Sequence, residues 1–579
     1  MTDKTFTLQC ISSLEKIFAD EFFYPEEILT SDTMLMGERY SFQAAYCLEN
    51  APGPVCARVE ASGPLAEYVQ IRRVGLAPSE FPNYPDGDSF VLRTTPGLYP
   101  DPLYDFDGTV PLLNDQWRSL WITIPAQCPL PSGTYDLTLT FTEKDIWEND
   151  TSAEKGQVLG SCTFSIHRIN ARLQPQTLIH TQWFHTDCIA DWYQVPVFSE
   201  RYWELVEKYM NCAVTYGINM ILTPLFTPPL DTAPGGERTT VQLVDIYRTG
   251  SGYEFGFERL DRWVRLCDRC GIRCLEFSHL FTQWGAEHAP KIMAYEGAPG
   301  AAAQGAPPVR IFGWDTDSGS DEYREFLDAF LPRLTDFIRE HGLEERCYFH
   351  VSDEPHREHL PNYLRARELV KRHIGKMPIM DALSDYEYYE QGLVEIPVCC
   401  NDHMEPFLEH QVPGMWTYYC CSQYKEVSNR FFCMPSIRSR VLGVQMYQYE
   451  IQGFLQWGFN FWNTFLSRRS VNPFCVTDAG CAFPSGDAFL VYPGEDGPIG
   501  SLRAEVFMEG LQDMRMLKLL ESLTDRETVM ELIEEDLDRP LTFRQYPHDI
   551  AWLMNLRGTC HEMIEELADM RKADGYAEG

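Results

Sequence analysis

The segment Arg346-Cys-Tyr-Phe-His-Val-Ser-Asp-Glu-Pro355 reads as a buried strand that ends in two carboxylates and a proline. In a barrel of alternating strands and helices, functional side chains lie at the carboxyl ends of the strands. The adjacent acids Asp353 and Glu354 therefore indicate acid/base chemistry on a bound substrate. An acid-acid-proline triplet is common at this composition, so the interpretation depends on the surrounding sequence.

Residues 173–525 contain buried strands that alternate with amphipathic segments. The predicted strands are Thr177–Phe184, Met220–Leu225, Arg273–Ser278, Cys347–Val351, Pro378–Ala382, Ile396–Cys400, Met415–Tyr419 and Gly453–Trp457. Helices are expected at 199–216, 257–269, 322–341, 361–373, 386–391, 404–410 and 436–451, and from 501 onward. Eight strands alternating with helices predict a (β/α)8 barrel of the TIM type.

The flanking regions have other patterns. Residues 1–172 contain short alternating strands, for example at 68–74, 119–124 and 134–141, separated by turns rich in Pro, Gly and Ser. This spacing predicts an all-β sandwich, for which scaffolding is favoured over carbohydrate binding. Residues 526–579 are expected to form a C-terminal helical extension. The predicted fold class is therefore multidomain, with an all-β region before an α/β barrel.

Composition limits the partners. A chain of 579 residues is expected to form two or three domains. The net charge of −37 argues against nucleic acid and anionic membranes as partners. The first residues lack the pattern of a signal peptide, and no stretch has about 18 uninterrupted apolar residues. We therefore expect a cytoplasmic protein, either monomeric or a homo-oligomer.

No cofactor or metal is expected. The 19 cysteines are scattered through predicted strands and helices, which indicates reduced thiols rather than a disulfide framework. Cys267, Cys270 and Cys274 resemble part of a zinc site, but they span a helix end and the next strand and have no second pair. Core cysteines are the favoured interpretation. No phosphate-binding loop, dinucleotide fingerprint or nucleophile elbow is present.

Polar and aromatic side chains recur at the predicted strand ends. They are Trp183, His185 and Asp187 after the first strand, His279 after the third, Asp381 on the fifth, and Asn401, Asp402 and His403 after the sixth. The seventh strand ends in Trp416 to Tyr419, and the eighth in Trp457 to Asn463. Aromatic rings stack on the C–H faces of a sugar, while polar groups bind its hydroxyls. The pattern therefore predicts a sugar site, although any single aromatic residue is equally compatible with the barrel core.

Five motifs occur in order along the barrel region. They are Phe349-His-Val-Ser-Asp-Glu-Pro355, Met415-Trp-Thr-Tyr-Tyr419, Ile451-Gln-Gly-Phe-Leu-Gln-Trp-Gly-Phe-Asn-Phe-Trp462, Gly486-Asp-Ala-Phe-Leu-Val-Tyr-Pro-Gly494 and Ser501-Leu-Arg503. Together they resemble the catalytic domain of glycoside hydrolase family 123. The resemblance implies an exo-acting, retaining β-N-acetylgalactosaminidase in which the acetamido oxygen of the substrate attacks the anomeric carbon.

The resemblance also implies roles for the acidic pair. Asp353 would orient the acetamide N–H and stabilise the positive intermediate, while Glu354 would protonate the leaving oxygen and then deprotonate water. Adjacent carboxylates resist simultaneous ionisation, so one of them is biased to hold a proton. Side chains at successive strand positions point in opposite directions, but a turn before Pro355 can direct both toward one substrate. The expected substrate-binding residues are Trp183, His185, His279, Asp381, Trp416, Tyr418, Trp457, Asn460, Trp462 and Asn463.

Three alternatives remain open at this point. Glu354 could be the acid of a conventional pair, with Asp381 or Glu276 as a separate nucleophile. The sugar could be N-acetylglucosamine or one without an acetamido group. The barrel could also be a non-catalytic carbohydrate-binding protein, although a binding protein has no need of a proton donor. In the enzyme interpretation the expected substrate is a small oligosaccharide or glycoside.

Overall fold

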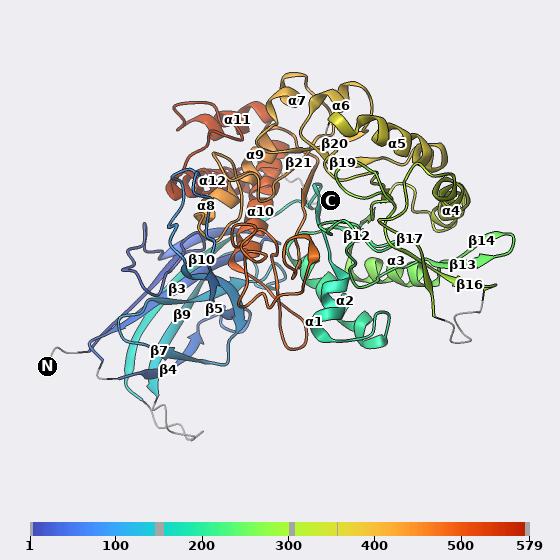
Figure 1. Cartoon of the computed structure of the whole chain (residues 1–579). Coiled ribbons are helices and arrows are strands. Elements are labelled where there is room, and N and C mark those ends of the chain that lie inside the picture. Colours follow the sequence, from blue (N-terminus) through green and yellow to red (C-terminus); the bar gives the residue numbers. More distant parts are fainter. Residues whose placement is uncertain (1–3, 52, 145–155, 300–306, 356, 574–579) are drawn as a thin grey trace. The chain divides into compact units, whose positions relative to one another are not determined.

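The computed structural model describes residues 4–51, 53–144, 156–299, 307–355 and 357–573. The chain forms two compact units (Figure 1). The first consists of Met1–Gln176, Ser428–Gln448 and Ile499–Gly579, and the second of Thr177–Val427 and Tyr449–Pro498. The chain thus passes to the second unit close to the boundary expected at residue 172, but it returns to the first unit twice.

The first unit contains two five-stranded sheets. One has the order β1 (Thr5–Ser12), β3 (Tyr40–Glu49), β8 (Arg118–Ile124), β5 (Gln70–Ser79) and β6 (Gly97–Asp105). The other has the order β2 (Ser31–Met36), β10 (Val158–Arg172), β9 (Gly133–Lys144), β4 (Val55–Ser62) and β7 (Thr109–Leu112). Apolar side chains of both sheets form one core, in which the rings of Phe42 and Phe164 stack at 4.3 Å. The predicted all-β region is confirmed.

Five helices also belong to the first unit. They are α8 (Ser436–Arg440), α9 (Leu442–Gln448), α10 (Leu502–Leu523), α11 (Arg526–Glu534) and α12 (Ile550–Ala573). Helix α12 packs on β10 and β2, and α10 packs on α8, α9 and α12. The sequence predicts segments 436–451 and 501–525 within the barrel domain. Most of their residues instead group with the sandwich.

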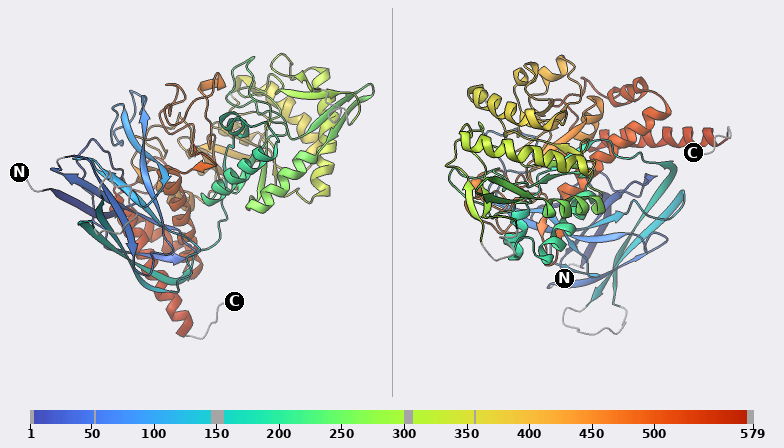
Figure 2. Two further views of the ribbon diagram at one scale, coloured as in Figure 1. Left: turned by 90° about the horizontal axis from the view of Figure 1, so that it is seen from below. Right: turned by 90° about the vertical axis from the view of Figure 1, so that its right-hand side faces the viewer.

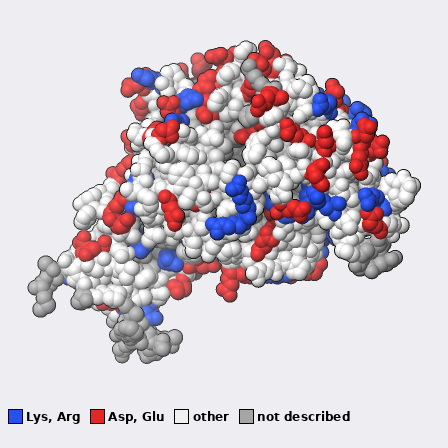
Figure 3. Space-filling model, viewed as in Figure 1, with Lys and Arg blue, Asp and Glu red and all other residues white. Residues whose placement is uncertain are grey.

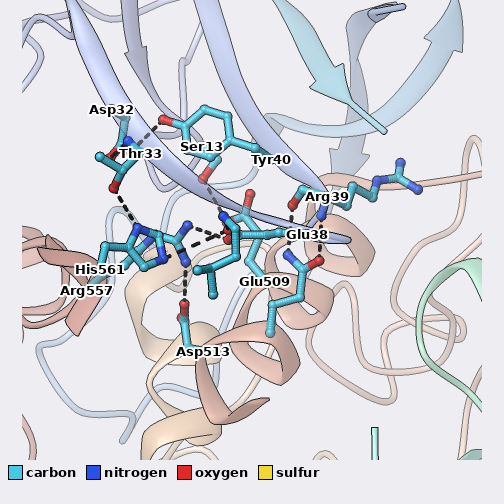
Figure 4. Close-up of polar contacts among 12 residues, drawn as sticks. Ser13, Asp32, Thr33, Glu38, Arg39, Tyr40, Glu509, Asp513, Arg557 and His561 are labelled. Atoms are coloured by element: carbon cyan, nitrogen blue, oxygen red, sulfur yellow. Dashed lines mark hydrogen bonds and ion pairs between the residues drawn. The ribbon is translucent and has the colours of Figure 1, made fainter. Parts of the chain in front are cut away.

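A buried network of charged side chains connects these helices to the sandwich strands (Figure 4). Arg557 on α12 donates to Glu38, which follows β2, and to Asp513 on α10, the latter at 3.1 Å. Arg440 on α8 donates to Asp513 at 2.7 Å and to Glu509 at 2.8 Å. All five side chains are buried. Because each charge depends on its partners, the network opposes separation of the helices from the sandwich.

The second unit contains the predicted barrel. Its eight strands have the order β18 (Cys347–Tyr348), β15 (Cys274–Phe277), β12 (Met220–Thr223), β11 (Ile179–Gln182), β22 (Gly453–Gln456), β21 (Trp416–Tyr418), β20 (Ile396–Cys400) and β19 (Met380–Leu383). All paired neighbours are parallel. A bridge between Phe349 and Ile379 closes the barrel between β18 and β19. Each strand lies where the sequence predicted it, so the fold class is confirmed.

Helices follow the first six strands in chain order. They are α1 (Thr186–Tyr193) and α2 (Glu200–Thr215), α3 (Glu258–Cys270), α4 (Asp321–Glu340), α5 (Leu360–Ile374), α6 (Tyr386–Glu390) and α7 (Glu405–Glu409). Ser199 and Ser320 cap α2 and α4 by accepting a backbone N–H, and Gly271 ends α3 in the left-handed conformation, with φ 88°. Helices α4 and α5 pack side by side (Figures 1 and 2).

A small sheet in the long barrel connections was not predicted. Its order is β14 (Gly252–Gly256), β13 (Asp245–Thr249), β16 (Ile292–Glu296) and β17 (Val309–Phe312). The strands are short, and most of their side chains are exposed or half-buried. Such segments lack the buried apolar run from which the barrel strands were recognised.

The barrel interior is filled by alternate strand residues, as a TIM-type core requires. Trp416 and Tyr418 of β21 and Leu455 of β22 belong to this interior core. A Cβ atom on Gly453 would lie 2.0 Å from Cδ2 of Trp416, so only glycine leaves room for this indole. Trp416 is 2% exposed. It was expected to bind substrate, but it is a core residue.

The surface agrees with the composition. Figure 3 shows acidic side chains scattered over the visible face, with basic side chains in small groups between them. None of the described helices is both long enough and apolar enough to cross a bilayer.

Candidate active site

The two acids of the opening segment lie on a turn. After the short strand β18 the chain leaves the sheet, and Glu354 adopts φ 43°, in the left-handed region. For a residue other than glycine this conformation costs about 1–2 kcal/mol. The backbone N–H of Trp284 donates to the carbonyl of Asp353 at 3.0 Å and holds the turn. As a result, the side chains of Asp353 and Glu354 line the same cavity.

This cavity has a volume of about 220 Å³ and is largely aromatic. Its rings belong to Trp183, Trp284, Tyr418, Trp457, Phe465 and Phe483. Its polar side chains include Asp231, Gln283, Asp353 and Glu354. Ligand pockets for drug-sized molecules usually measure about 300–1,000 Å³, so this cavity suits a small ligand such as one sugar unit.

A second, wider cavity of about 640 Å³ adjoins the first. Glu354, Tyr418 and Ser422 line both cavities. Most of the other lining residues of the second cavity follow β19 and β20, among them Tyr386, which begins α6, and His403. Glu354 therefore lies at the boundary between an aromatic cavity and a more open one.

The surroundings of Asp353 favour its protonated form. Burial, followed by the negative charge of Glu354, raises the pKa of Asp353 well above its ordinary value, and the charge of His350 opposes this rise. The carboxyl group of Glu354 accepts a hydrogen bond of 2.8 Å at Oε1 from the hydroxyl of Tyr418. When no ligand is bound, burial therefore favours a proton on Asp353.

Two indoles of the cavity are held by their N–H groups. Trp183 donates to Oε1 of Glu276 at 2.8 Å, and Trp457 donates to Oδ2 of Asp487 at 3.0 Å. Both polar edges are thereby satisfied by protein, which leaves the apolar ring faces for a ligand. Trp183, Tyr418 and Trp457 thus lie in the cavity, as predicted together with the acidic pair.

Asp231 and Gln283 also line the cavity, although the sequence pattern did not predict them. The backbone N–H of Asp231 donates to Oε1 of Gln283 at 2.5 Å. Oδ2 of Asp231 and Nε2 of Gln283 are buried and have no hydrogen-bond partner among the described residues. Burial raises the pKa of Asp231 to about 6, against the opposing charge of Arg238. An unpaired acceptor beside an unpaired donor suits neighbouring hydroxyls of a sugar.

Both residues lie in loops that follow predicted strands. In loops, hydrophobic periodicity does not predict where a side chain points. The same is true of Trp284 and Phe465, each of which is 38% exposed at the cavity. Their only sequence signal is the presence of polar and aromatic residues soon after a strand end.

His185 supports the cavity wall and does not line it. Its Nδ1 accepts from Arg238 at 3.0 Å, and its Nε2 donates to the carbonyl of Trp457 at 2.9 Å. Burial and the charge of Arg238 lower the pKa of His185 to about 3, so the ring is neutral. Arg238 is also paired with Asp187 at 2.7 Å. Asp187 and His185 were both predicted at the site. Both bind Arg238 and so support the cavity from behind.

Three further predicted residues are bound by protein. Asn460 exchanges hydrogen bonds of 2.8 and 3.0 Å with the backbone of His185. Trp462 donates to the carbonyl of Val491 at 3.1 Å, and Asn463 donates to Sγ of Cys188 at 3.4 Å. All three predicted side chains are buried outside the cavity lining. In the free structure these three residues are thus part of the framework around the cavity and not of its lining.

His279 and Asp381 lie beneath the cavity. Asp381 is fully buried and hydrogen-bonded to His350, and His279 stacks on His350 with ring centroids 4.1 Å apart. These three residues are close enough to suggest a metal site. However, both ring nitrogens of His350 face carboxylates, which leaves it no lone pair for a metal. Neither His279 nor Asp381 lines the cavity, contrary to the prediction.

The strand-end residues after β20 have different positions. Asn401 is buried, whereas His403 lines the second cavity. Nδ1 of His403 lies 2.8 Å from Oδ1 of Asp402 and 3.3 Å from Sγ of Cys400. These three side chains could also approach one ion, but in this structure they bind one another.

Comparison with known proteins gives the family. The family model described as glycoside hydrolase 123, catalytic domain, matches residues 183–520. A family 123 glycoside hydrolase from Clostridium perfringens, solved in work on glycolipid glycan hydrolysis, has a TM-score of 0.71 and 15% identity, covering 98% of each chain. A β-glucuronidase from Bifidobacterium dentium has a TM-score of 0.30 and 8% identity, covering 88% of this chain and 67% of its own. No curated protein matches the chain significantly.

The match to the Clostridium perfringens structure supports the overall fold. At 15% identity it supports the fold alone and not the activity. The family model carries the assignment, because it spans more than half of the chain and includes both acids and every aromatic residue of the cavity. The protein is therefore a glycoside hydrolase and belongs to family 123.

Proposed function

We propose that the protein is a retaining exo-β-N-acetylgalactosaminidase that uses the acetamido group of its substrate as the nucleophile. The observation that carries the proposal is the position of Glu354 between the two cavities. A terminal sugar in the small cavity and its leaving group in the wider one would place the glycosidic oxygen beside Glu354. An acid at that boundary can protonate the oxygen as the bond breaks.

Asp353 would receive the acetamide N–H. In the free enzyme the proton of the pair rests on Asp353, because burial raises its pKa. Donation of the acetamide N–H to Asp353 favours its anion, so the proton passes to Glu354 when substrate binds. Substrate binding thereby gives Glu354 the proton that the reaction needs.

The chemical steps then balance. The acetamido oxygen forms a bond to the anomeric carbon, the bond to the leaving oxygen breaks, and Glu354 transfers its proton to that oxygen. Asp353, now an anion, stabilises the positively charged oxazoline-type intermediate. Water then loses a proton to Glu354 and attacks the same carbon, which reopens the ring with the original configuration. Substrate-assisted enzymes of this kind differ from the usual pair of opposed carboxylates.

The two carboxylates considered as separate nucleophiles are poorly placed for attack. Glu276 and Asp381 are fully buried, and neither lines the cavity. Both are hydrogen-bonded to His350. A nucleophile must reach the anomeric carbon, so their position favours the acetamido mechanism.

Asp231 gives a specific second candidate. Asp231 lines the same cavity as Glu354, and its buried Oδ2 has no hydrogen-bond partner among the described residues. A glycosidase for N-acetylglucosamine or for a sugar without an acetamido group could use Glu354 as acid and Asp231 as nucleophile. In the favoured proposal Asp231 and Gln283 instead bind sugar hydroxyls. The natural substrate class is a glycan or small oligosaccharide with a terminal β-linked N-acetylgalactosamine, in line with the glycolipid glycans named for the Clostridium perfringens enzyme.

A substrate panel tests the proposal. Chromogenic β-N-acetylgalactosaminide, its gluco isomer and the galactoside without an acetamido group would be compared for kcat/KM, and NMR would follow the anomer released first. Turnover of the first substrate with retention, lost in Glu354→Gln and Asp353→Asn, is expected. Preference for the gluco isomer would correct the sugar. Cleavage of the plain galactoside with retention would reject acetamide assistance and favour Asp231 as nucleophile.

A further inference from the structure

His350 is a fully buried histidine held between two carboxylates. Its Nε2 lies 2.7 Å from Oε1 of Glu276, and its Nδ1 lies 3.1 Å from Oδ1 of Asp381. An imidazole can donate at both nitrogens only when it carries two protons. Although burial alone would lower it, hydrogen bonds with Asp381 and Glu276 raise the pKa of His350 to about 9. His350 is therefore an imidazolium at neutral pH.

The partners of His350 are fixed in turn. Glu276 also accepts from Nε1 of Trp183 at 2.8 Å and from the hydroxyl of Thr181 at 2.5 Å. Asp381 also accepts from the hydroxyl of Tyr363 on α5 at 2.6 Å. A continuous chain of hydrogen bonds therefore extends from α5, through His350, to an indole that lines the cavity.

The charges around His350 are unbalanced without it. His279 stacks on its ring, but burial and the charge of His350 lower the pKa of His279, so this neighbour is neutral. The carboxyl groups of Glu276 and Asp381 contact the ring of His350. Asp353 lies on the cavity side, and the negative charges of Glu354 and Asp231 raise its pKa. The charge of His350 offsets part of this negative charge.

We propose that His350 is a positioning residue, which fixes Trp183 through Glu276 and supplies the positive charge that lets Asp353 ionise when substrate binds. The first part follows from Oε1 of Glu276, which binds both His350 and Trp183. The second follows from the place of His350 three residues before Asp353, where its charge opposes the effects of burial and of Glu354. The proposal rests on the proposed function, in which Asp353 is an anion in the complex.

The variant His350→Gln tests this role through the pH profile. Loss of a nearby opposite charge typically changes a carboxylate's pKa by about 1–3 units. The acid limb of kcat/KM that reports Asp353, as distinct from any limb of Asp231, is therefore expected to move up by at least about one unit, and KM is expected to rise as Trp183 loses its support. Tyr363→Phe is the matched control, because it removes a hydrogen bond to Asp381 without removing a charge. A His350→Gln profile that superimposes on the wild type would overturn the proposal.

Adding Glu276→Gln to His350→Gln removes one uncompensated carboxylate. It is expected to move the limb part of the way back, which a purely structural role of His350 would not produce. If the limb stays where His350→Gln put it, the charge argument is refuted.

A direct measurement covers the case in which the variants fail to fold. In the wild-type protein labelled with ¹⁵N-histidine, one slowly exchanging imidazolium should persist at about pH 8, where an ordinary histidine is neutral. Detection of only neutral rings would overturn the proposal. By contrast, a wild-type enzyme that cleaves no acetamido glycoside but keeps this imidazolium would reject the proposed function alone.

Discussion

Replacement of Asp231 by asparagine separates a sugar contact from a nucleophile. The change keeps the size of the side chain and removes its charge. Asp231 lines the cavity, and its buried Oδ2 accepts no hydrogen bond from any described residue. A hydrogen bond to a charged group contributes about 1.5–3 kcal/mol. At about 1.36 kcal/mol per factor of ten, kcat/KM should fall roughly 10- to 150-fold.

The pH dependence gives a second signature of the same variant. Burial raises the pKa of Asp231 to about 6, so the side chain is an anion above that pH and gains a proton below it. Wild-type kcat/KM should therefore carry a limb that falls below about pH 6, and Asp231→Asn should lack it. Gln283→Met is the neutral comparison: it removes the Nε2 donor and also the Oε1 acceptor of the Asp231 N–H, should cost at least roughly 2- to 13-fold, and should retain the limb.

The assay is kcat/KM on a chromogenic β-N-acetylgalactosaminide from pH 4.5 to 8, with and without sodium azide. A loss beyond about 10⁴-fold, with azide restoring turnover as an α-glycosyl azide, would identify Asp231 as the nucleophile and refute the acetamido mechanism. A change below about twofold is smaller than one hydrogen bond and would show that Asp231 does not contact the sugar.

Three other variants have defined outcomes. Glu354→Gln should lower kcat/KM by about 10²- to 10⁴-fold for a sugar leaving group, but far less for a dinitrophenyl group that needs no proton; equal losses would contradict its role as acid. Arg557→Ala removes the arginine partner of buried Glu38 and leaves Asp513 with Arg440 alone, and it should cost about 3–5 kcal/mol, or roughly 6–10 °C in calorimetry; an unchanged melting temperature would contradict the importance of the network. Burial raises the pKa of Glu509 to about 7, so its contribution to stability is full below about pH 4.5 and is lost as pH rises through 7. Glu509→Gln should therefore remove up to about 3 kcal/mol of the decline in unfolding free energy between pH 5 and 8, whereas parallel curves for the two proteins would refute this.

The barrel and the acidic pair could be predicted because their signals are local. Strands of a closed parallel barrel are covered on both sides, so each appears as a short apolar run between polar segments. The acids Asp353 and Glu354 could be placed because they end such a run directly before Pro355. The turn that brings both to one cavity was also anticipated, and the φ of 43° at Glu354 provides it.

Depth along a strand could not be predicted in the same way. Trp416 and Tyr418 are two residues apart and therefore face the same side of β21. Tyr418 reaches the cavity, whereas Trp416 fills the barrel interior over Gly453. Alternation gives the face of a strand, and only the packing of the neighbouring strands decides which residue meets solvent.

Loop residues were missed for a different reason. Asp231 and Gln283 lie in separate connections, and a hydrogen bond between them joins the two loops. No periodicity constrains such positions, and their meeting depends on contacts far apart in sequence. The same reason explains why the late helices group with the sandwich and not with the barrel: Arg440 and Arg557 pair with Asp513 of α10, and Arg557 also pairs with Glu38 after β2, far away in sequence.

Under the proposed mechanism, the negative charge beneath and around the cavity contributes to specificity. Asp353 holds the proton of the pair in the free enzyme, because its burial and the charge of Glu354 raise its pKa. When an acetamide N–H donates to Asp353, it favours the Asp353 anion, and the proton moves to Glu354. A 2-hydroxyl group stabilises that anion less well. A sugar without the acetamido group would therefore find Glu354 without a proton to donate, even if it bound well. Discrimination against such a sugar should accordingly appear in kcat more than in KM, because the missing interaction acts at the step in which the bond breaks.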